Sequence, residues 1–320
     1  MNILFCDYPS EMQQDFTYEK EYLKKHLPAA NIICRPYYNQ QQLINDLHNI
    51  DVLRTAFIPV NNDVFAASKL KFISVNAAGY DTIDLAAAKK HNVHIMNVPD
   101  YCTNEVAEHT MALMLSLARH LKTYDQQIST EHIWQFQTQT DIYRLYGKTM
   151  ALFGWGKISQ AVAKRAAAFG IKTLVVSQHL TEEQAALQHV ECANADTALA
   201  QADIISNHMQ PNIDNHNYFS AQIFNKMNYC PLFLNTGRGS TVDESALISA
   251  LQSKKIAGAG LDVLASETPD LINNPLTKMN NVIITPHAAF YSQESLQDLS
   301  RRSCENIISF FTDEQKNYII

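Results

Sequence analysis

The stretch MALFGWGKISQAVAKRAAAFG at residues 150–170 decides the fold of this chain. It is typical of an apolar strand over Met150–Phe153, a Gly-x-Gly turn and a helix over Gln160–Phe169. Glycine permits the tight turn and lets the backbone approach a pyrophosphate, while the helix N-terminus offers free N–H groups to phosphate oxygens. We therefore predict a dinucleotide-binding β-α unit. The residues expected to hold the phosphates are Gly154, Gly156, Lys157 and Ile158.

Two departures from the usual fingerprint of such units follow. Ser159 stands at the third glycine position, so we expect slightly looser packing of helix on strand. NAD-specific sheets place an acid after the second strand, on the ribose 2′-hydroxyl. Here Ser177, Gln178 and His179 follow the predicted strand Thr173–Val176, and none is an acid. All three can donate hydrogen bonds to a 2′-phosphate, so we expect NADP or NAD as cofactor, with NADPH accepted. An NAD enzyme that binds the ribose through a neutral group is the alternative.

Apolar runs of strand length alternate with segments of helical length along the chain, which predicts parallel sheets built from β-α units. A first series of strands is expected at Ile3–Phe5, Ile32–Cys34, Val52–Leu53, Phe72–Val75 and Ile95–Val98. A second series is expected at Met150–Phe153, Thr173–Val176, Ile204–Ser206, Leu232–Asn235, Ala259–Val263 and Val282–Thr285.

Two series of strands in a chain of 320 residues predict two α/β domains, each with a doubly wound parallel sheet. A long helix over Asn104–Ile128 lies between the series. A helix over Gln293–Phe311 follows the second series without a strand of its own, so we expect it to return to the first domain. With crossings near Pro99 and Pro286, residues 1–99 and 287–320 form the expected discontinuous substrate domain, and residues 100–286 the dinucleotide-binding domain.

Composition excludes several classes of protein. The net charge is −7 and no long basic run is present, which argues against a nucleic-acid partner. The apolar stretch Val106–Leu121 contains four charged or histidine side chains, so it predicts a buried helix and not a membrane span. The first residues read as a strand and not as a signal peptide. Six widely spaced cysteines indicate reduced thiols in the cytoplasm, with neither disulfides nor a metal site.

Three polar residues follow strands of the second series. Arg238 follows Leu232–Asn235, Glu267 follows Ala259–Val263, and His287 directly follows Thr285-Pro286. Ligands of doubly wound sheets bind outside the carboxyl ends of the strands, so these side chains can converge although they lie far apart in sequence. Each residue alone would more often be an ordinary loop or turn residue. Their common placement favours a catalytic set.

The three residue types match the reduction of a 2-keto acid. A histidine can donate the proton near neutral pH, and a carboxylate beside it favours the protonated ring and fixes its orientation. An arginine can bind a carboxylate in bidentate fashion and polarise the ketone. We therefore predict His287 as acid/base, Glu267 as its partner and Arg238 as substrate anchor.

The sequence resembles the D-isomer-specific 2-hydroxyacid dehydrogenase family over nearly its whole length. The resemblance rests on an ordered series of motifs: Ala78–Asp84, Asn97–Tyr101, the Gly-x-Gly turn, Asn235–Gly239 followed by Val242-Asp243, Gly258–Val263 and Thr285–His287. The segment His287–Tyr291 looks most like the D-lactate dehydrogenase and C-terminal-binding-protein branches. Ser206–Pro211 departs from the family pattern, because its proline is shifted by one residue.

The resemblance implies a Rossmann cofactor domain, a flavodoxin-like substrate domain and a homodimer formed through the cofactor domain. It implies that backbone N–H groups around Ala78 and Gly79 hold the substrate carboxylate, with Tyr101 and Tyr291 nearby. It places Asp262 near the nicotinamide amide. Further cofactor contacts are implied for Thr103, His208, Thr236 and Gly237.

The expected function is the reduction of a small 2-keto acid to the D-2-hydroxy acid, with pyruvate to D-lactate as the first candidate. Hydroxypyruvate or glyoxylate reduction is the nearest alternative. A dinucleotide-sensing corepressor that docks peptides is an alternative of another class, because the resemblance to the C-terminal-binding-protein branch leaves the same catalytic set in place.

Overall fold

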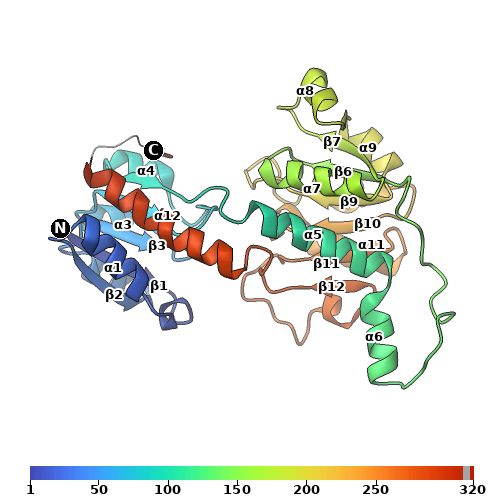
Figure 1. Cartoon of the computed structure of the whole chain (residues 1–320), viewed down its shortest axis with the longest axis horizontal. Helices are drawn as coiled ribbons and strands as arrows, with labels where there is room; N and C mark the ends of the chain where they lie inside the picture. The colour runs from blue at the N-terminus through green and yellow to red at the C-terminus, as the bar shows by residue number, and fades with distance from the viewer. Residues whose placement is uncertain (313–317) are drawn as a thin grey trace. The chain divides into compact units, whose positions relative to one another are not determined.

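The computed structural model describes residues 1–312 and 318–320. It contains two compact units: unit 1 is Met1–Tyr101 with Ser292–Ile320, and unit 2 is Cys102–Tyr291 (Figure 1). Both boundaries lie a few residues beyond the crossings expected at Pro99 and Pro286. The second lies later because the Asp262 carboxylate accepts hydrogen bonds from the N–H groups of Ala288 and Ala289 and so holds this segment in unit 2.

Unit 1 contains a five-stranded parallel sheet of order β2-β1-β3-β4-β5, which is the flavodoxin-like order. Its strands are β1 (Asn2–Asp7), β2 (Asn31–Pro36), β3 (Val52–Thr55), β4 (Phe72–Val75) and β5 (His94–Met96). Its helices are η1 (Glu11–Gln13), α1 (Thr17–His26), α2 (Gln40–Asp46), α3 (Asn62–Ala67), α4 (Leu85–Lys90) and α12 (Gln293–Thr312). Asn39, Asn61 and Asp84 cap α2, α3 and α4, because each side chain accepts a backbone N–H of the first turn.

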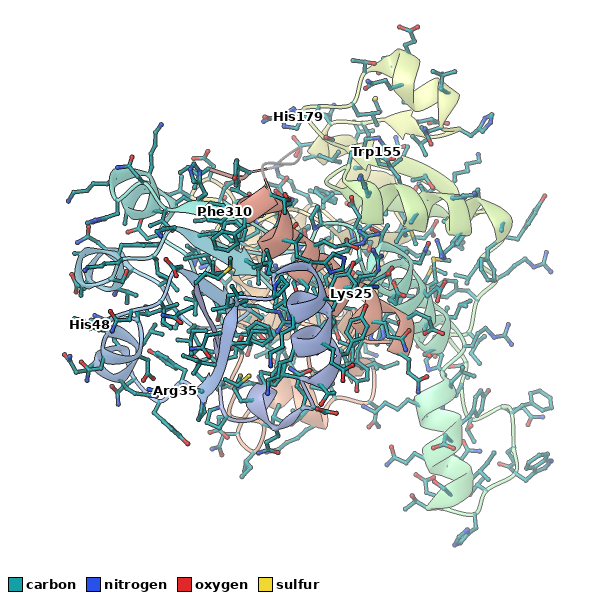
Figure 2. The ribbon with its side chains drawn as sticks, turned by 60° about the vertical axis from the view of Figure 1, so that its left-hand side comes forward. Lys25, Arg35, His48, Trp155, His179 and Phe310 are labelled. Carbon is teal, nitrogen blue, oxygen red and sulfur yellow. The ribbon has the colours of Figure 1, made fainter. Side chains whose placement is uncertain are left out.

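Helix α12 packs on the sheet of unit 1. Phe310 of α12 (labelled in Figure 2) stacks on Phe72 of β4 with ring centroids 4.7 Å apart. The backbone carbonyl of Ser303 accepts the hydroxyl of Ser74 at 2.9 Å, within the same buried surface. The last helix of the chain therefore completes the unit that the first strands begin.

Unit 2 contains a seven-stranded parallel sheet of order β12-β11-β10-β9-β6-β7-β8. Its strands are β6 (Thr149–Phe153), β7 (Lys172–Val176), β8 (Glu191–Cys192), β9 (Ile204–Asn207), β10 (Leu232–Asn235), β11 (Gly258–Leu261) and β12 (Val282–Ile284). Its helices are α5 (Thr103–Ala118), α6 (Leu121–Ser129), α7 (Lys157–Ala168), α8 (Glu182–Leu187), α9 (Ala195–Gln201), α10 (Ala221–Asn225), α11 (Glu244–Gln252), η2 (Gly239–Thr241) and η3 (Pro275–Lys278). The strand order reverses between β6 and β9, and such a reversal opens a ligand crevice at the carboxyl ends of the strands.

The predicted fold class is confirmed: both sheets are parallel and doubly wound. Two details of the prediction were wrong. The helix expected over Asn104–Ile128 is two helices, α5 and α6, because His120 adopts a left-handed conformation with φ of 52° and ends the first. The short strand β8 was missed, because two partly exposed residues, one of them Glu191, make no strand pattern.

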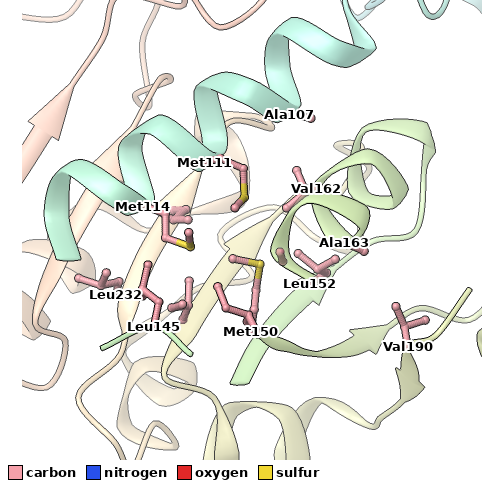
Figure 3. Packing of buried hydrophobic residues seen from close by; sticks show 14 of the residues in the cluster. Ala107, Met111, Met114, Leu145, Met150, Leu152, Val162, Ala163, Val190 and Leu232 are labelled. Atoms are coloured by element: carbon pink, nitrogen blue, oxygen red, sulfur yellow. The ribbon is translucent and has the colours of Figure 1, made fainter. Parts of the chain in front are cut away.

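The core of unit 2 lies between α5, α7 and one face of the sheet. Figure 3 shows Met111 of α5 facing Val162 of α7, Met114 further along α5, and Met150 and Leu152 of β6 beneath them. All five side chains are almost completely buried. This packing fixes the start of α7 relative to the end of β6, which is where the Gly-x-Gly turn lies. None of the described helices combines the length and the apolar character that a membrane crossing requires.

Candidate active site

The glycine turn after β6 has the geometry that the sequence predicts. Gly154 has a φ of +97°, and a Cβ added there would lie 2.8 Å from the carbonyl oxygen of His208, so a larger residue is excluded. Gly156 precedes the first residue of α7, and a Cβ added there would enter open space. The backbone at the start of this twelve-residue helix is therefore accessible to a phosphate, which fits the predicted dinucleotide. Lys157 and Ile158 form the first turn of the helix.

Ser159 adds a hydrogen bond to the turn. The side chain is fully buried, and its Oγ donates a hydrogen bond of 2.8 Å to the carbonyl oxygen of Gly154. A serine at this position thus closes the loop with a bond that a glycine would not make.

No acidic residue stands among the three residues that follow β7. Ser177 is half-buried and its Oγ accepts the backbone N–H of His179, while Gln178 and His179 are exposed. Figure 2 shows His179 and Trp155 on the loops that follow β7 and β6. These loops follow adjacent strands of the sheet, so the predicted ribose-binding residues and the glycine turn lie at one edge.

His208 follows β9 and is held as a neutral ring. Burial lowers its pKa to about 4, and its Nε2 lies 2.9 Å from the hydroxyl of Ser206. Its backbone N–H donates to the carbonyl of Phe153, so the loops after β6 and β9 are joined. Thr236, predicted to contact the cofactor, is buried, and its hydroxyl lies 2.8 Å from that of Thr110 on α5.

Arg238 lies in a tight turn between β10 and η2. Its Nη1 donates to the carbonyl oxygen of Gly237 at 3.0 Å. Gly239 is buried against the backbone of the segment after β11: a Cβ added there would lie 1.7 Å from the carbonyl oxygen of Leu264. The absence of a side chain at 239 is what allows the turn of Arg238 and the segment that leads to Glu267 to touch.

Glu267 and His287 form the pair that the sequence predicts. Nδ1 of His287 lies 3.0 Å and 3.1 Å from the two carboxylate oxygens of Glu267. The hydrogen bond from His287 lowers the pKa of Glu267, and the charges of His287 and Arg238 lower it further. The carboxylate of Glu267 therefore stays ionised at a lower pH than an ordinary glutamate, and it holds the ring of His287 through Nδ1. The other ring nitrogen, Nε2, is left to exchange a proton.

Asp262 anchors the loop of His287. The residue is 1% exposed; its carboxylate accepts the hydroxyl of Thr285 at 2.6 Å and the N–H groups of Ala288 and Ala289 at 2.9 Å each. His287 has a φ of 50°, and its N–H donates to the backbone carbonyl of Asp262. This conformation, uncommon for any residue but glycine, is thus held from both sides. That Asp262 also contacts a nicotinamide amide stays a prediction.

Four predicted substrate and cofactor contacts lie at the ends of elements outside this cluster. Ala78 and Gly79 follow β4 in unit 1, and the amide of Asn97 donates to the carbonyl of Ala78 at 2.7 Å. Tyr101 is buried in unit 1, whereas Thr103 is the first residue of α5 in unit 2. Their roles stay predictions, as does that of Tyr291, which is 66% exposed.

Two residues of this region were missed from the sequence. His109 of α5 lies with its Nε2 2.9 Å from the hydroxyl of Thr285, the same hydroxyl that Asp262 accepts. Asn207 is fully buried at the end of β9, and its side chain donates hydrogen bonds to Asn235 at the end of β10 and to Thr241 of η2. Asn207 carried a signal, because a polar residue directly after a predicted apolar strand lies at the carboxyl edge of the sheet. His109 carried none, because it lies within a helical pattern.

Comparisons with known proteins agree with this geometry. The family model described as "D-isomer specific 2-hydroxyacid dehydrogenase, NAD binding domain" matches residues 111–289. A glycerate dehydrogenase of Methylorubrum extorquens is 31% identical over 289 residues, which cover 88% of this chain and 89% of that protein.

Solved structures are similar over the whole chain. An acyclic imino acid reductase in complex with NADPH and D-Arg superposes with a TM-score of 0.89 at 26% identity, covering 100% of both chains. A D-lactate dehydrogenase of Aquifex aeolicus, complexed with NAD and lactic acid, superposes with a TM-score of 0.87 at 25% identity, covering 99% of each. With the parallel sheets, the glycine turn and the histidine–carboxylate pair, these matches show that the chain belongs to the D-isomer-specific 2-hydroxyacid dehydrogenase family of nicotinamide-dependent oxidoreductases.

Proposed function

We propose that this enzyme reduces a small 2-keto acid to the D-2-hydroxy acid, with pyruvate as the first candidate substrate. The observation that carries the proposal is the pair formed by His287 and Glu267, at 3.0 Å, with the charge of Arg238 acting on the same carboxylate. A proton donor, its orienting partner and a carboxylate-binding cation are the groups that this reaction needs from the protein.

Each residue has a defined part in the proposed reaction. A bound nicotinamide supplies the hydride that reduces the ketone carbon. Arg238 binds the substrate carboxylate and polarises the keto oxygen. His287 gives the proton at Nε2 to that oxygen, because Nδ1 is bonded to Glu267. Glu267 stabilises the protonated ring before transfer, and in the oxidation direction it favours uptake of the proton.

The proposed cofactor is NADP or NAD, with NADPH accepted. Support comes from Ser177, Gln178 and His179, which place no negative charge where a 2′-phosphate would lie. The two similar structures were solved with NADPH in one and NAD in the other.

Hydroxypyruvate is the second candidate substrate, because the relative that is 31% identical over most of its length is named for glycerate. Both candidates share a carboxylate beside a ketone, which is the part that Arg238 and His287 address. They differ in one hydroxyl on the methyl carbon.

A substrate panel tests the proposal. Pyruvate, hydroxypyruvate and glyoxylate are each assayed with NADH and with NADPH, following the absorbance of the reduced nicotinamide. We expect turnover of at least one acid by the wild type, loss of that turnover in His287→Ala, and its retention in His216→Ala, an exposed histidine of the same unit. Absence of turnover with every acid and both cofactors would contradict the proposal and favour a binding protein.

We also propose that the chain forms a homodimer through unit 2. Helix α6 and the segment after it expose a group of large apolar side chains: Leu121, Ile128, Ile133, Trp134 and Phe136, with exposed fractions from 38% to 87%. The amide of buried Gln127 donates to the carbonyls of Ile133 and Gln135, so the segment is held in place while its apolar side chains face outward. Such a patch marks an interaction surface.

Light scattering on eluting protein measures the oligomer. Trp134→Ser should shift the wild-type dimer toward monomer, whereas Tyr229→Ser, at an exposed aromatic residue elsewhere in unit 2, should leave it unchanged. A monomeric wild type would refute the homodimer.

We further propose a cytoplasmic location, supported by six cysteines that are all free thiols.

A further inference from the structure

The carbonyl oxygen of Arg238 accepts two hydrogen bonds from side chains. Nδ2 of Asn235 donates to it at 3.1 Å, and Oγ1 of Thr241 donates at 2.7 Å. Asn235 and Thr241 are 1% and 0% exposed. The peptide unit from which the Arg238 side chain extends is therefore fixed from inside unit 2.

The side chain of Asn207 forms hydrogen bonds with both of these donor residues. Its Nδ2 donates to Oδ1 of Asn235 at 3.0 Å and to Oγ1 of Thr241 at 2.7 Å. The two N–H bonds of the Asn207 amide thus donate to one oxygen of Asn235 and one oxygen of Thr241. The hydroxyl proton of Thr241 and the NH₂ group of Asn235 are then free to point at the carbonyl of Arg238.

Two backbone N–H groups fix the direction of this network. Gly237 N–H donates to Oδ1 of Asn235, and Met209 N–H donates to Oδ1 of Asn207. A backbone N–H can only donate, so neither amide can turn over without placing NH₂ against N–H. The hydrogen bonds of this network can therefore run in one direction only, from the NH₂ group of Asn207 to the carbonyl oxygen of Arg238.

We propose that Asn207 is a positioning residue for substrate binding, acting through the turn of Arg238. The inference rests on the proposed function, in which Arg238 binds the substrate carboxylate. Asn207 lies at the end of β9, beside β10 and level with Asn235. A bidentate contact between guanidinium and carboxylate depends on orientation as well as charge, so a loosened turn weakens it.

A double-mutant cycle with Arg238 separates positioning from general stability. Asn207→Leu should lower kcat/KM for the keto acid roughly tenfold or more, because the buried acceptor oxygens of Asn235 and Thr241 lose the donor that holds them. In an Arg238→Lys background, which has already lost the bidentate contact, the same change should cost little, because coupled residues are not additive. Asn281→Leu is the control. Asn281 directly precedes β12 and donates a side-chain hydrogen bond to the carbonyl of Ala257, so this change removes one hydrogen bond of the same kind and should leave kcat/KM unchanged.

Asn207→Asp gives a second, pH-dependent readout that also serves if Asn207→Leu does not fold. An aspartate has no donor when ionised, but its neutral acid has one O–H, and burial raises the pKa of such a group toward neutral pH. The ratio of its kcat/KM to that of the wild type should therefore rise as the pH falls from about 8 to about 6.

The outcomes are distinguishable. If Arg238→Lys keeps wild-type kcat/KM, the proposed role of Arg238 fails and this inference fails with it. If Arg238→Lys is impaired but the loss in Asn207→Leu is absent, or equal in both backgrounds, only the inference on Asn207 is overturned. A ratio for Asn207→Asp that does not change with pH overturns it as well. Non-additive loss with recovery at low pH supports it.

Discussion

Replacement of Gly239 by alanine should disable the catalytic set without touching a catalytic residue. The new Cβ would lie 1.7 Å from the carbonyl oxygen of Leu264, 2.2 Å from its carbon and 2.9 Å from the nitrogen of Ala265. All three atoms are backbone, so no rotation of a side chain relieves the contact. The two segments must separate until the shortest distance reaches about 3.0 Å.

The size of the effect follows from this displacement. Gly239 adjoins Arg238, and Leu264 lies three residues before Glu267, so both partners of the site move on the order of 1 Å. A misplacement of about 1 Å at a catalytic group costs roughly 10²-fold in rate. Overpacking of this kind also costs about 1–3 kcal/mol of folding free energy.

Steady-state kcat/KM with a keto acid, together with the affinity for the reduced cofactor, measures the outcome. We expect kcat/KM to fall about a hundredfold while cofactor affinity stays within a few fold. Gly147→Ala is the matched control: its φ of +79° strains an alanine, but its Cβ would meet no atom within 4 Å. That variant should lose stability and keep kcat/KM. A Gly239→Ala enzyme with wild-type kcat/KM would refute the reasoning.

Four further predictions concern single side chains. His287→Ala should lower kcat about 10²–10⁴-fold with cofactor affinity unchanged; wild-type kcat would remove it from the site. Glu267→Gln removes the carboxylate that holds Nδ1 of His287, so kcat/KM for the keto acid should fall; a variant with wild-type kcat/KM would argue against the pair. Ser177→Asp should swing the kcat/KM ratio toward NADH, and a wild type already about a hundredfold selective for NADH would contradict the argument from charge. His208 has a pKa of about 4 in the fold against 6.5 when unperturbed, so the unfolded chain binds more protons between these values. Its contribution to stability is complete above about pH 6.5 and falls by up to roughly 3 kcal/mol toward pH 4. The urea midpoint of His208→Gln should therefore fall less between pH 6.5 and pH 4 than that of the wild type, and an equal dependence on pH in both proteins would contradict the prediction.

The glycine turn and the contact between Glu267 and His287 were predictable because their signals are local. Each residue lies in the loop that follows an apolar strand, and parallel strands bring their carboxyl ends to one edge. Hence Glu267 and His287 were paired from the sequence, although twenty residues separate them. The break between α5 and α6 was not predictable, since the helical pattern continues through His120 and nothing there signals a left-handed residue.

The buried polar network was beyond sequence reasoning for a different reason. Asn207 finds its partners 28 and 34 residues away, and a pattern of apolar and polar residues does not say which polar group will be buried with which. The hydrogen bond of Ser159 was not predicted, on the same ground. Its hydroxyl bonds to a carbonyl five residues back, a contact that the three-glycine fingerprint does not include.

Several buried polar groups at this edge of unit 2 hold the loops that contain the proposed catalytic residues. Asp262 would be costly in the interior if its carboxylate had no donors, and its donors are the backbone N–H groups that follow His287 and the hydroxyl of Thr285. Asn207 and Asn235 stand in the same relation to Arg238. Glu267 has no such anchor among the described contacts: it is 67% exposed and held by His287 itself. The fold therefore holds the loops of Arg238 and His287, whereas the side chain of Glu267 is held by His287. Under the proposed mechanism, substitutions that loosen the two anchored loops should lower kcat/KM more than substitutions that loosen residues 264–267.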